Sequence, residues 1–244
     1  MIWVLAVSLA LTIAYWLIVV TEGSYLGTKV VEAMYDWGAS HYDQAKQVLP
    51  QDDARHLARP LLLALQGKSS PLVLDVGVGT GRVPLALLRQ WDFDGKIVGA
   101  DLSRSMLAQA ARKTEAQRER VLIVRSEAMH LPFTDSCFDA VTCLETLELL
   151  AQPSSALREI ARVLSGRGRL LVSNRIGVDS FFFPRRAYRR RQIASTFDQF
   201  GLVDVVIRHW NTHYDLVWAQ KVATASDLGM QPHMSPPAEP ANRT

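Results

Sequence analysis

The stretch from Leu72 to Gly81, LVLDVGVGTG, carries much of the information about the fold of this 244-residue chain. Its first half is a short apolar run, typical of a buried strand, and its second half has three glycines at alternate positions. Glycine tolerates positive φ and lets a ligand approach the backbone amides closely. A helical pattern follows at residues 82–90. Strand, glycines and helix in this order indicate either a tight turn or a ligand-binding loop.

Beyond this stretch, short apolar runs alternate with helical stretches. Strands are predicted at Leu72–Val76, 96–100, Val121–Arg125, Phe138–Cys143 and 170–173, and helices at 82–90, 103–116 and 155–164, the last ended by Gly166 and Gly168. This alternation is typical of a parallel sheet with right-handed crossovers. Two further runs, Leu202–His209 and 213–221, flank a short link and predict an antiparallel hairpin that closes the sheet. We therefore expect an α/β fold built as a three-layer sandwich.

Two carboxylates beside the glycines suggest what the loop binds. Asp101 ends the second predicted strand, 22 residues after Gly79, where a two-oxygen acceptor suits the hydroxyl pair of a ribose. Asp75 lies two residues before Gly77, where it would repel a pyrophosphate but can accept hydrogen bonds from an ammonium group. The spacing is GxGxG rather than the GxGxxG of dinucleotide loops. The ligand implied has adenosine at one end and an amino acid at the other.

The overall composition excludes several classes of protein. A net charge of +3 is too small for the dense basic face of a nucleic-acid-binding protein, so no nucleic acid partner is expected. Two cysteines are too few for a disulfide framework or a four-cysteine zinc site, and we expect no metal. A content of 48% hydrophobic residues excludes extended disorder.

Part of that hydrophobic content lies in the N-terminal run Ile2–Val20, which has no side chain that is charged at neutral pH. As a helix rising about 1.5 Å per residue it spans roughly 28 Å, close to the hydrocarbon thickness of a bilayer. Trp3 and Trp16 lie near its ends, as in interfacial aromatic belts. A cleaved signal peptide would need a basic start and a small-residue cleavage site, and a buried core helix is usually shorter. Among these three interpretations the pattern favours an uncleaved transmembrane helix, and we assign residues 1–21 to an anchor.

Residues 22–70 are predicted to form a helical lid or linker segment. Apolar residues between positions 24 and 47 recur at helical spacing, which indicates one or two short amphipathic helices, and a further helix is expected from residue 50 to 65. The main domain then covers residues 71–221. Serine, proline and small residues dominate 222–244, where we expect a disordered tail.

Five motifs stand in order: DVGVGTG (75–81), GADLSRSMLAQA (99–110), SEAMHLPF (126–133), FDAVTC (138–143) and LREIARVLSGRGRLLVSN (157–174). Together they resemble the motifs of class I S-adenosylmethionine-dependent methyltransferases, of the methyltransferase type 11-like group that is similar to quinone and lipid methyltransferases. The final DLVWAQK is similar to the end of that family's last hairpin. The resemblance implies a mostly parallel, seven-stranded Rossmann-like sheet with an antiparallel terminal hairpin, and S-adenosyl-L-methionine as the cofactor.

The resemblance also implies which residues bind the methionine and ribose parts of this cofactor. Gly77, Gly79 and Gly81 would hold both parts against the backbone. Asp75 would lie near the amino acid end, and Asp101 would bind the ribose hydroxyls.

For the adenine, the resemblance implies that Leu102 packs on the ring and Glu127 accepts a hydrogen bond from the N6 amino group, with the Ala128 amide beside it. The family usually has Asp where this chain has Glu127. The stretch YDWGASHYD is similar to the helix that many relatives fold over the cofactor, which makes Tyr35 and Tyr42 candidate lid residues.

The methyl acceptor is less clearly indicated. The segment CLETLE after the fourth predicted strand differs from the NPPY type, so adenine, cytosine and glutamine are not expected as acceptors. Glu145 is a candidate general base, and the alternative is that it is a helix-start carboxylate facing the helix dipole. His130 is interpreted as structural or solvent-facing, and Cys143 as a packing residue.

The stretch from Phe181 to Arg191 contains three consecutive phenylalanines and five arginines. It could be an exposed helix with a basic face whose aromatic residues enter the core. It could also be a membrane-surface patch, with aromatic residues in the interface and arginines at anionic headgroups.

These observations predict a single-pass, membrane-tethered S-adenosylmethionine-dependent methyltransferase with its catalytic domain on the cytoplasmic side. Its acceptor is expected to be small and lipophilic or membrane-associated, such as a quinone precursor or a lipid headgroup. The alternative is a non-catalytic S-adenosylmethionine-binding protein with an assembly or regulatory role at the membrane.

Overall fold

The sheet lies at the centre of the computed structural model, which describes residues 1–46 and 49–223. It has seven strands in the order β3-β2-β1-β4-β5-β7-β6. Pairs among β1 to β5 are parallel, and β7 is antiparallel to both β5 and β6. The strands are β1 (Leu72–Val76), β2 (Lys96–Asp101), β3 (Val121–Arg125), β4 (Phe138–Cys143), β5 (Leu164–Arg175), β6 (Leu202–His209) and β7 (Tyr214–Lys221). The predicted mixed sheet with a terminal hairpin is confirmed.

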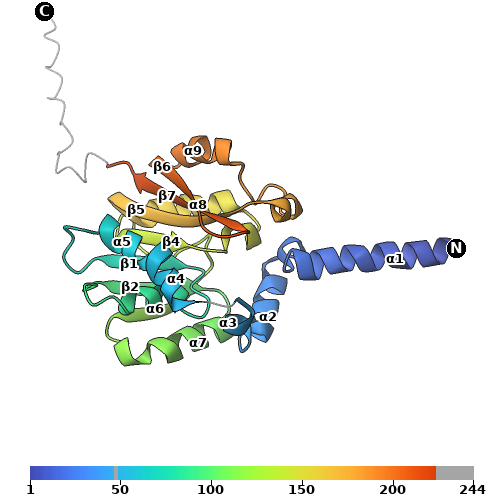
Figure 1. Ribbon diagram of the computed structural model, residues 1–244, viewed down its shortest axis with the longest axis horizontal. Helices are drawn as coiled ribbons and strands as arrows, with labels where there is room; N and C mark the ends of the chain where they lie inside the picture. Colours follow the sequence, from blue (N-terminus) through green and yellow to red (C-terminus); the bar gives the residue numbers. More distant parts are fainter. Residues whose placement is uncertain (47–48, 224–244) are drawn as a thin grey trace, which may run out of the picture.

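Helices cover both faces of this sheet (Figure 1). The main-domain helices are α6 (Arg82–Leu88), α7 (Arg104–Thr114), α8 (Pro153–Val163) and α9 (Arg190–Asp198). The helical segments before the sheet are α2 (Thr28–Gly38), α3 (Tyr42–Lys46), α4 (Pro50–Asp53), a π-helical turn at Ala54–Ala58, and α5 (Arg59–Ala64). One expected helix over 50–65 is therefore a near-continuous helical segment with a π turn in its middle.

Two hydrophobic cores lie on opposite faces because side chains alternate along each strand. One core packs Leu57 and Leu61 with Val73 of β1. The other packs Leu157 of α8 with Leu74, the next residue of β1. Helix, sheet and helix thus form the three predicted layers.

The transition from α8 to β5 differs from the prediction. The helix ends at Val163 and β5 begins at Leu164, so Gly166 and Gly168 lie within the strand and do not end the helix. Leu164 already pairs with Phe138, and the register then shifts before Arg169 pairs with Ala140. A Cβ on Gly168 would lie 2.7 Å from the carbonyl oxygen of Ser165, so this glycine permits the irregular backbone there. Pairing in the sheet decides this boundary, and the glycines only allow it.

The N-terminal segment forms helix α1 (Ile2–Tyr15), which continues as a π-helical turn at Trp16–Val20 and extends away from the domain (Figure 1). Within residues 1–46 and 49–223, Ile2–Val20 is the one helix long and apolar enough to cross a membrane. Its mean hydropathy is 2.3, and none of it is buried against the domain. It is a candidate membrane span. All but the first two residues of the tail predicted at 222–244 lie outside the described residues.

Candidate functional site

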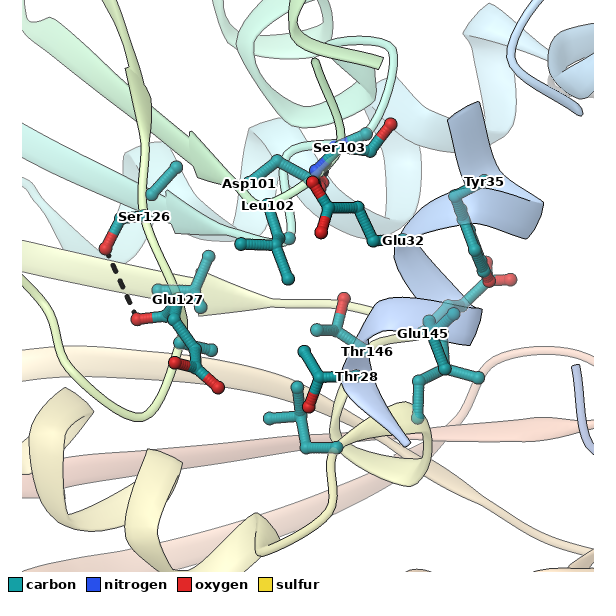
Figure 2. A pocket seen from close by; sticks show the side chains of 18 of the residues that line it. Thr28, Glu32, Tyr35, Asp101, Leu102, Ser103, Ser126, Glu127, Glu145 and Thr146 are labelled. Atoms are coloured by element: carbon teal, nitrogen blue, oxygen red, sulfur yellow. Dashed lines mark hydrogen bonds between the residues drawn. The ribbon is translucent and has the colours of Figure 1, made fainter. Parts of the chain in front are cut away.

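A cavity opens at the carboxyl ends of β1, β2 and β4. Between β1 and β4 the order of strands along the chain reverses, and ligands of open α/β sheets bind in the crevice at such a point. The cavity contains about 830 Å³ of empty space, part of it open to solvent. Figure 2 shows Tyr35 and Thr28 from α2 on one side and Ser126 and Glu127 on the other, with Asp101 and Leu102 between them.

The glycine loop forms part of the cavity wall. Gly77 has a φ of +73°, and a Cβ on it would lie 2.1 Å from Oγ1 of Thr146. Gly79 also has positive φ and lines the same cavity, and the atom nearest to a Cβ on it would be the Gly77 carbonyl oxygen, at 4.0 Å. Gly81 begins α6 in the left-handed conformation and faces Ala110 of α7, away from the cavity lining. The structure thus places two of the three predicted glycines at the cavity, and Gly81 at the packing of α6 on α7.

Asp101 holds the loop from the end of β2. Its Oδ2 accepts a hydrogen bond from the Gly79 N–H at 2.9 Å, and its Oδ1 accepts one from the Ser103 N–H at 3.0 Å. Burial raises the pKa of this carboxyl, and the backbone hydrogen bonds oppose that rise. Each oxygen keeps a further lone pair for a ligand hydroxyl. The position fits the expected ribose contact.

Asp75 lines a smaller cavity that shares Tyr42, Gly77 and Gly79 with the first. Its carboxylate is buried and accepts a hydrogen bond from the Thr142 hydroxyl at 2.6 Å. Burial raises the pKa of Asp75 to about 7, although the hydrogen bond from Thr142 opposes the rise. A buried carboxyl with one protein donor gains most from a cationic partner, such as an ammonium group.

Helix α2 covers the cavity through interactions with the main domain. Asp36 accepts hydrogen bonds from the Ser103 hydroxyl at 2.5 Å and from the Ser105 N–H at 2.9 Å. Glu32, which lines the cavity, pairs with Arg125 at the end of β3 at 2.7 Å. These contacts fix α2 over the ends of β2 and β3.

The two predicted lid tyrosines lie side by side, with ring centroids 6.0 Å apart, and both line the cavity. The Tyr35 hydroxyl donates to Oε2 of Glu22 at 2.5 Å. Burial raises the pKa of Tyr42 to about 12 and that of Tyr35 well above its ordinary value. Both phenols are neutral at physiological pH, as ordinary tyrosines are, and the Tyr35 proton is donated to Glu22.

Glu145, the candidate general base of the sequence analysis, lines both cavities. It precedes a short 3-10 turn, Leu147–Leu149, rather than an α-helix. Its Oε2 lies 2.7 Å from Nζ of Lys46, and its Oε1 lies 2.9 Å from Nη1 of Arg82. Arg82 also pairs with the buried Asp53 at 2.7 Å. Glu145 is thus the centre of an ion-pair network that ties α3 to α6, and neither oxygen is left without a cationic partner.

The residues predicted to contact the adenine lie at the end of the cavity opposite Tyr35. Leu102, Glu127 and Ala128 all line it, together with Ser126 and Met129. His130 is exposed and lies 3.6 Å from Oε2 of Glu127. Cys143 is fully buried in the core, as expected of a packing residue.

Sequence reasoning missed several charged groups that shape the site. Arg82 directly follows the glycine loop, so its place at the start of a helix could have indicated a role there. Lys46, Glu32 and Asp36 carry no comparable signal. Contacts more than 60 residues apart in the chain bring each of them to the site.

Comparisons with known proteins agree with this geometry. Residues 74–172 match a family model described as a methyltransferase domain. The chain is 31% identical over 172 residues to the demethylmenaquinone methyltransferase of Lactobacillus johnsonii, an alignment that covers 65% of this chain and 70% of that protein. The chain belongs to the class I S-adenosylmethionine-dependent methyltransferases. Its cofactor is S-adenosyl-L-methionine.

A second relative of this class I methyltransferase is the demethylmenaquinone methyltransferase of Lactiplantibacillus plantarum. The two are 35% identical over 143 residues, which is 58% of this chain and 60% of that protein. The chain therefore spans about 60% of that relative's length. A solved structure described as a putative S-adenosyl-L-methionine-dependent methyltransferase from Methanococcus maripaludis has a TM-score of 0.61 at 19% identity. That alignment covers 78% of this chain and 94% of the other, and it shows a shared fold.

The residues present fit the cofactor. The close approach of Gly77 to Thr146 leaves no space for a side chain, Gly79 exposes its backbone to the cavity, and Asp75 is a buried carboxylate without a cationic partner in ion-pair distance among the described residues. In this class I methyltransferase the methionine end would lie at Asp75, the ribose at Asp101, and the adenine between Leu102 and Glu127.

Proposed function

We propose that this protein transfers the methyl group of S-adenosylmethionine to a small lipophilic acceptor of the quinone type, while tethered to a membrane by Ile2–Val20. The observation that carries the proposal is the arrangement of helix, lid and cavity. Tyr35 lines the cavity, and its hydroxyl bonds to Glu22, two residues after the candidate span. An acceptor dissolved in the bilayer would thus have a short path to the cavity.

The relatives support the acceptor class, since both are demethylmenaquinone methyltransferases by name. The lining of the main cavity supports it as well, because Val31, Leu144, Leu149 and Leu150 contribute apolar surface beside the polar cofactor contacts. An aromatic head group with an apolar tail suits such a mixed surface.

In this proposal the protein positions the acceptor and excludes water. The bound cofactor supplies a methyl group that is already activated on a sulfonium. Tyr42 lines the cavity, and its neutral phenol can donate a hydrogen bond to an acceptor oxygen, whereas the Tyr35 proton is already donated to Glu22. Glu145 acts as a positioning residue, because its ion pairs with Lys46 and Arg82 hold α3 against the glycine loop.

The test uses the full chain in detergent micelles or nanodiscs, with S-adenosylmethionine and a reduced demethylnaphthoquinone that carries a prenyl tail. We expect the acceptor to gain one methyl group by mass spectrometry, with S-adenosylhomocysteine as the second product. Binding of the cofactor by calorimetry, without turnover on this acceptor or on membrane extract, would contradict the proposal and favour the non-catalytic alternative.

The side of the membrane on which the domain lies is part of the same proposal. We place residues 22–244 at the cytoplasmic face, where the donor is made. Protease added to intact cells should spare the domain and, after lysis, should degrade it. Degradation in intact cells would show the opposite orientation.

A further inference from the structure

Residues 176–191, which connect β5 to α9 and include the first two residues of that helix, do not line the cofactor cavity. The segment forms a 3-10 turn at Val178–Phe182 and then an irregular stretch up to Arg190, where α9 begins, so it is not the continuous exposed helix of the first of the two interpretations. Phe183 is buried and 1% exposed, whereas Phe181 is 81% exposed. One phenylalanine therefore secures the segment in the fold while another projects from it.

This segment is attached to the base of the N-terminal helix. The Tyr25 hydroxyl donates to the carbonyl of Pro184 at 3.0 Å, and the guanidinium of Arg186 lies 4.2 Å from the centroid of the Tyr25 ring. The other face of the junction is Trp16, which stacks on Tyr25 at 5.4 Å. Figure 1 shows the orange segment after β5 at the end of the domain from which α1 departs.

The segment also has positive charge that the described fold does not neutralise. Arg185, Arg189 and Arg191 are exposed, and no carboxylate of residues 1–46 or 49–223 lies within ion-pair distance of them. Its one acidic residue, Asp179, is paired with His213 at 2.5 Å. The arginines Arg185 and Arg189 line an open hollow beside Phe181.

We propose that residues 178–191 form a docking surface for the anionic phospholipid headgroups of the membrane that holds α1. The inference rests on the proposed tether, because a helix that spans the bilayer brings its own base to the headgroup layer. At that depth an exposed phenylalanine can enter the interface while unpaired arginines meet lipid phosphates. Charge and position thus favour an anionic bilayer over a soluble partner.

Docking would also orient the cofactor cavity. Nη1 of Arg186 donates to the carbonyl of Leu149 at 3.1 Å, and Leu149 lines the cavity. Tyr25 lies three residues before Thr28, the first residue of α2, which lines the same cavity. The headgroup surface, the anchor base and the cavity wall therefore form one connected unit.

The test measures amide hydrogen exchange of the full chain in nanodiscs of phosphatidylcholine alone or mixed with phosphatidylglycerol. We expect peptides from 2–20 to be protected in both discs, and peptides from 178–191 to exchange about tenfold more slowly in the anionic discs only. The triple variant Arg185→Gln, Arg189→Gln, Arg191→Gln should lose this lipid dependence without a change in melting temperature.

A matched control removes three other exposed arginines, by Arg55→Gln, Arg59→Gln and Arg89→Gln, on elements that Figure 1 shows far from α1. It should keep the lipid-dependent protection. Equal exchange of 178–191 in both discs, protection retained by the first triple variant, or protection produced by inorganic phosphate in neutral discs would each overturn the docking surface while 2–20 stays protected. Exchange of 2–20 at the rate of a solvent-exposed helix would overturn the tether itself.

Discussion

Asp75 and Asp101 lie near the carboxyl ends of neighbouring strands but differ in the hydrogen bonds that their carboxylates accept. Asp101 accepts hydrogen bonds from two backbone N–H groups, whereas Asp75 accepts one hydrogen bond within the described fold, from the Thr142 hydroxyl. Hydrogen bonds to a carboxylate favour its charged form, and burial disfavours it. Asp101 is thus held in place by the glycine loop, whereas burial dominates the surroundings of Asp75.

Replacing Asp101 with Ala should weaken S-adenosylmethionine binding by about 1–3 kcal/mol, because hydrogen bonds to the ribose and to the Gly79 N–H are lost together. Calorimetric titration measures the affinity. Asp101→Asn is the matched variant, since it keeps one acceptor oxygen and should lose less. Unchanged affinity in a folded Asp101→Ala protein would refute the assigned role.

The raised pKa of Asp75 predicts a pH dependence of cofactor binding. The carboxylate must be charged to pair with an ammonium group, and its pKa is about 7 in the cofactor-free protein. Affinity should therefore fall as the pH drops below 7, approaching a tenfold loss per pH unit. Titrations from pH 7 to pH 5 test this, and Asp75→Asn should bind weakly with no such slope. An equal slope in both proteins would contradict the prediction.

The same pKa has the opposite consequence for the stability of the cofactor-free chain. The folded state holds the Asp75 proton more tightly than the unfolded chain, whose value is near the ordinary 3.8. The contribution of this group to the free energy of unfolding should be present below the ordinary pKa and should decline as the pH rises toward about 7. Denaturant unfolding of the wild type against Asp75→Asn isolates this effect.

At the scale of elements, the glycine loop and the end of β4 fit together without room for a side chain. Gly77→Ala combines a left-handed residue with a Cβ 2.1 Å from Thr146 Oγ1. Gly67→Ala is a matched control, because Gly67 also has positive φ but has no atom within 4 Å of the added Cβ. The control substitution should lower the free energy of unfolding by about 1–2 kcal/mol.

We expect Gly77→Ala to lower the free energy of unfolding clearly more than Gly67→Ala does, and to abolish detectable cofactor binding, because Thr146 or the loop must move. Thermal unfolding and calorimetry give the two readouts. If Gly77→Ala binds the cofactor as well as Gly67→Ala does, the loop does not form the cofactor wall.

The elements whose positions were hardest to predict are those held by distant contacts. The Asp36 contacts with Ser103 and Ser105 bring α2 over the cavity. The pairing of Leu164 with Phe138 moves the start of β5 six residues earlier than the apolar run alone indicates. Local sequence patterns around Asp36 and Leu164 do not indicate these distant contacts.

At the scale of the whole molecule, an apolar helix leaves one end of the domain, and the cofactor cavity lies close to its base. Removal of residues 1–15 should move the protein from the membrane to the soluble fraction without loss of cofactor affinity, since all of these residues are exposed and Trp16 stays stacked on Tyr25. Turnover of a long-tailed quinol in vesicles should fall strongly, whereas turnover of a tail-less analogue should be unchanged. Equal loss on both acceptors would indicate damage to the domain instead of a lost tether.

The order of strands and helices, the glycine loop, the two carboxylates and the apolar N-terminal helix are all readable in the chain, because each depends on local periodicity or on adjacent residues. The ion pairs of Glu145, the position of α2 and the attachment of residues 176–191 to Tyr25 are not. They arise from side chains that meet only after the sheet has formed and brought distant segments to the same edge. Local patterns therefore identify this fold and its cofactor, and tertiary contacts alone decide what surrounds the cofactor cavity and which face of the domain lies beside the apolar N-terminal helix.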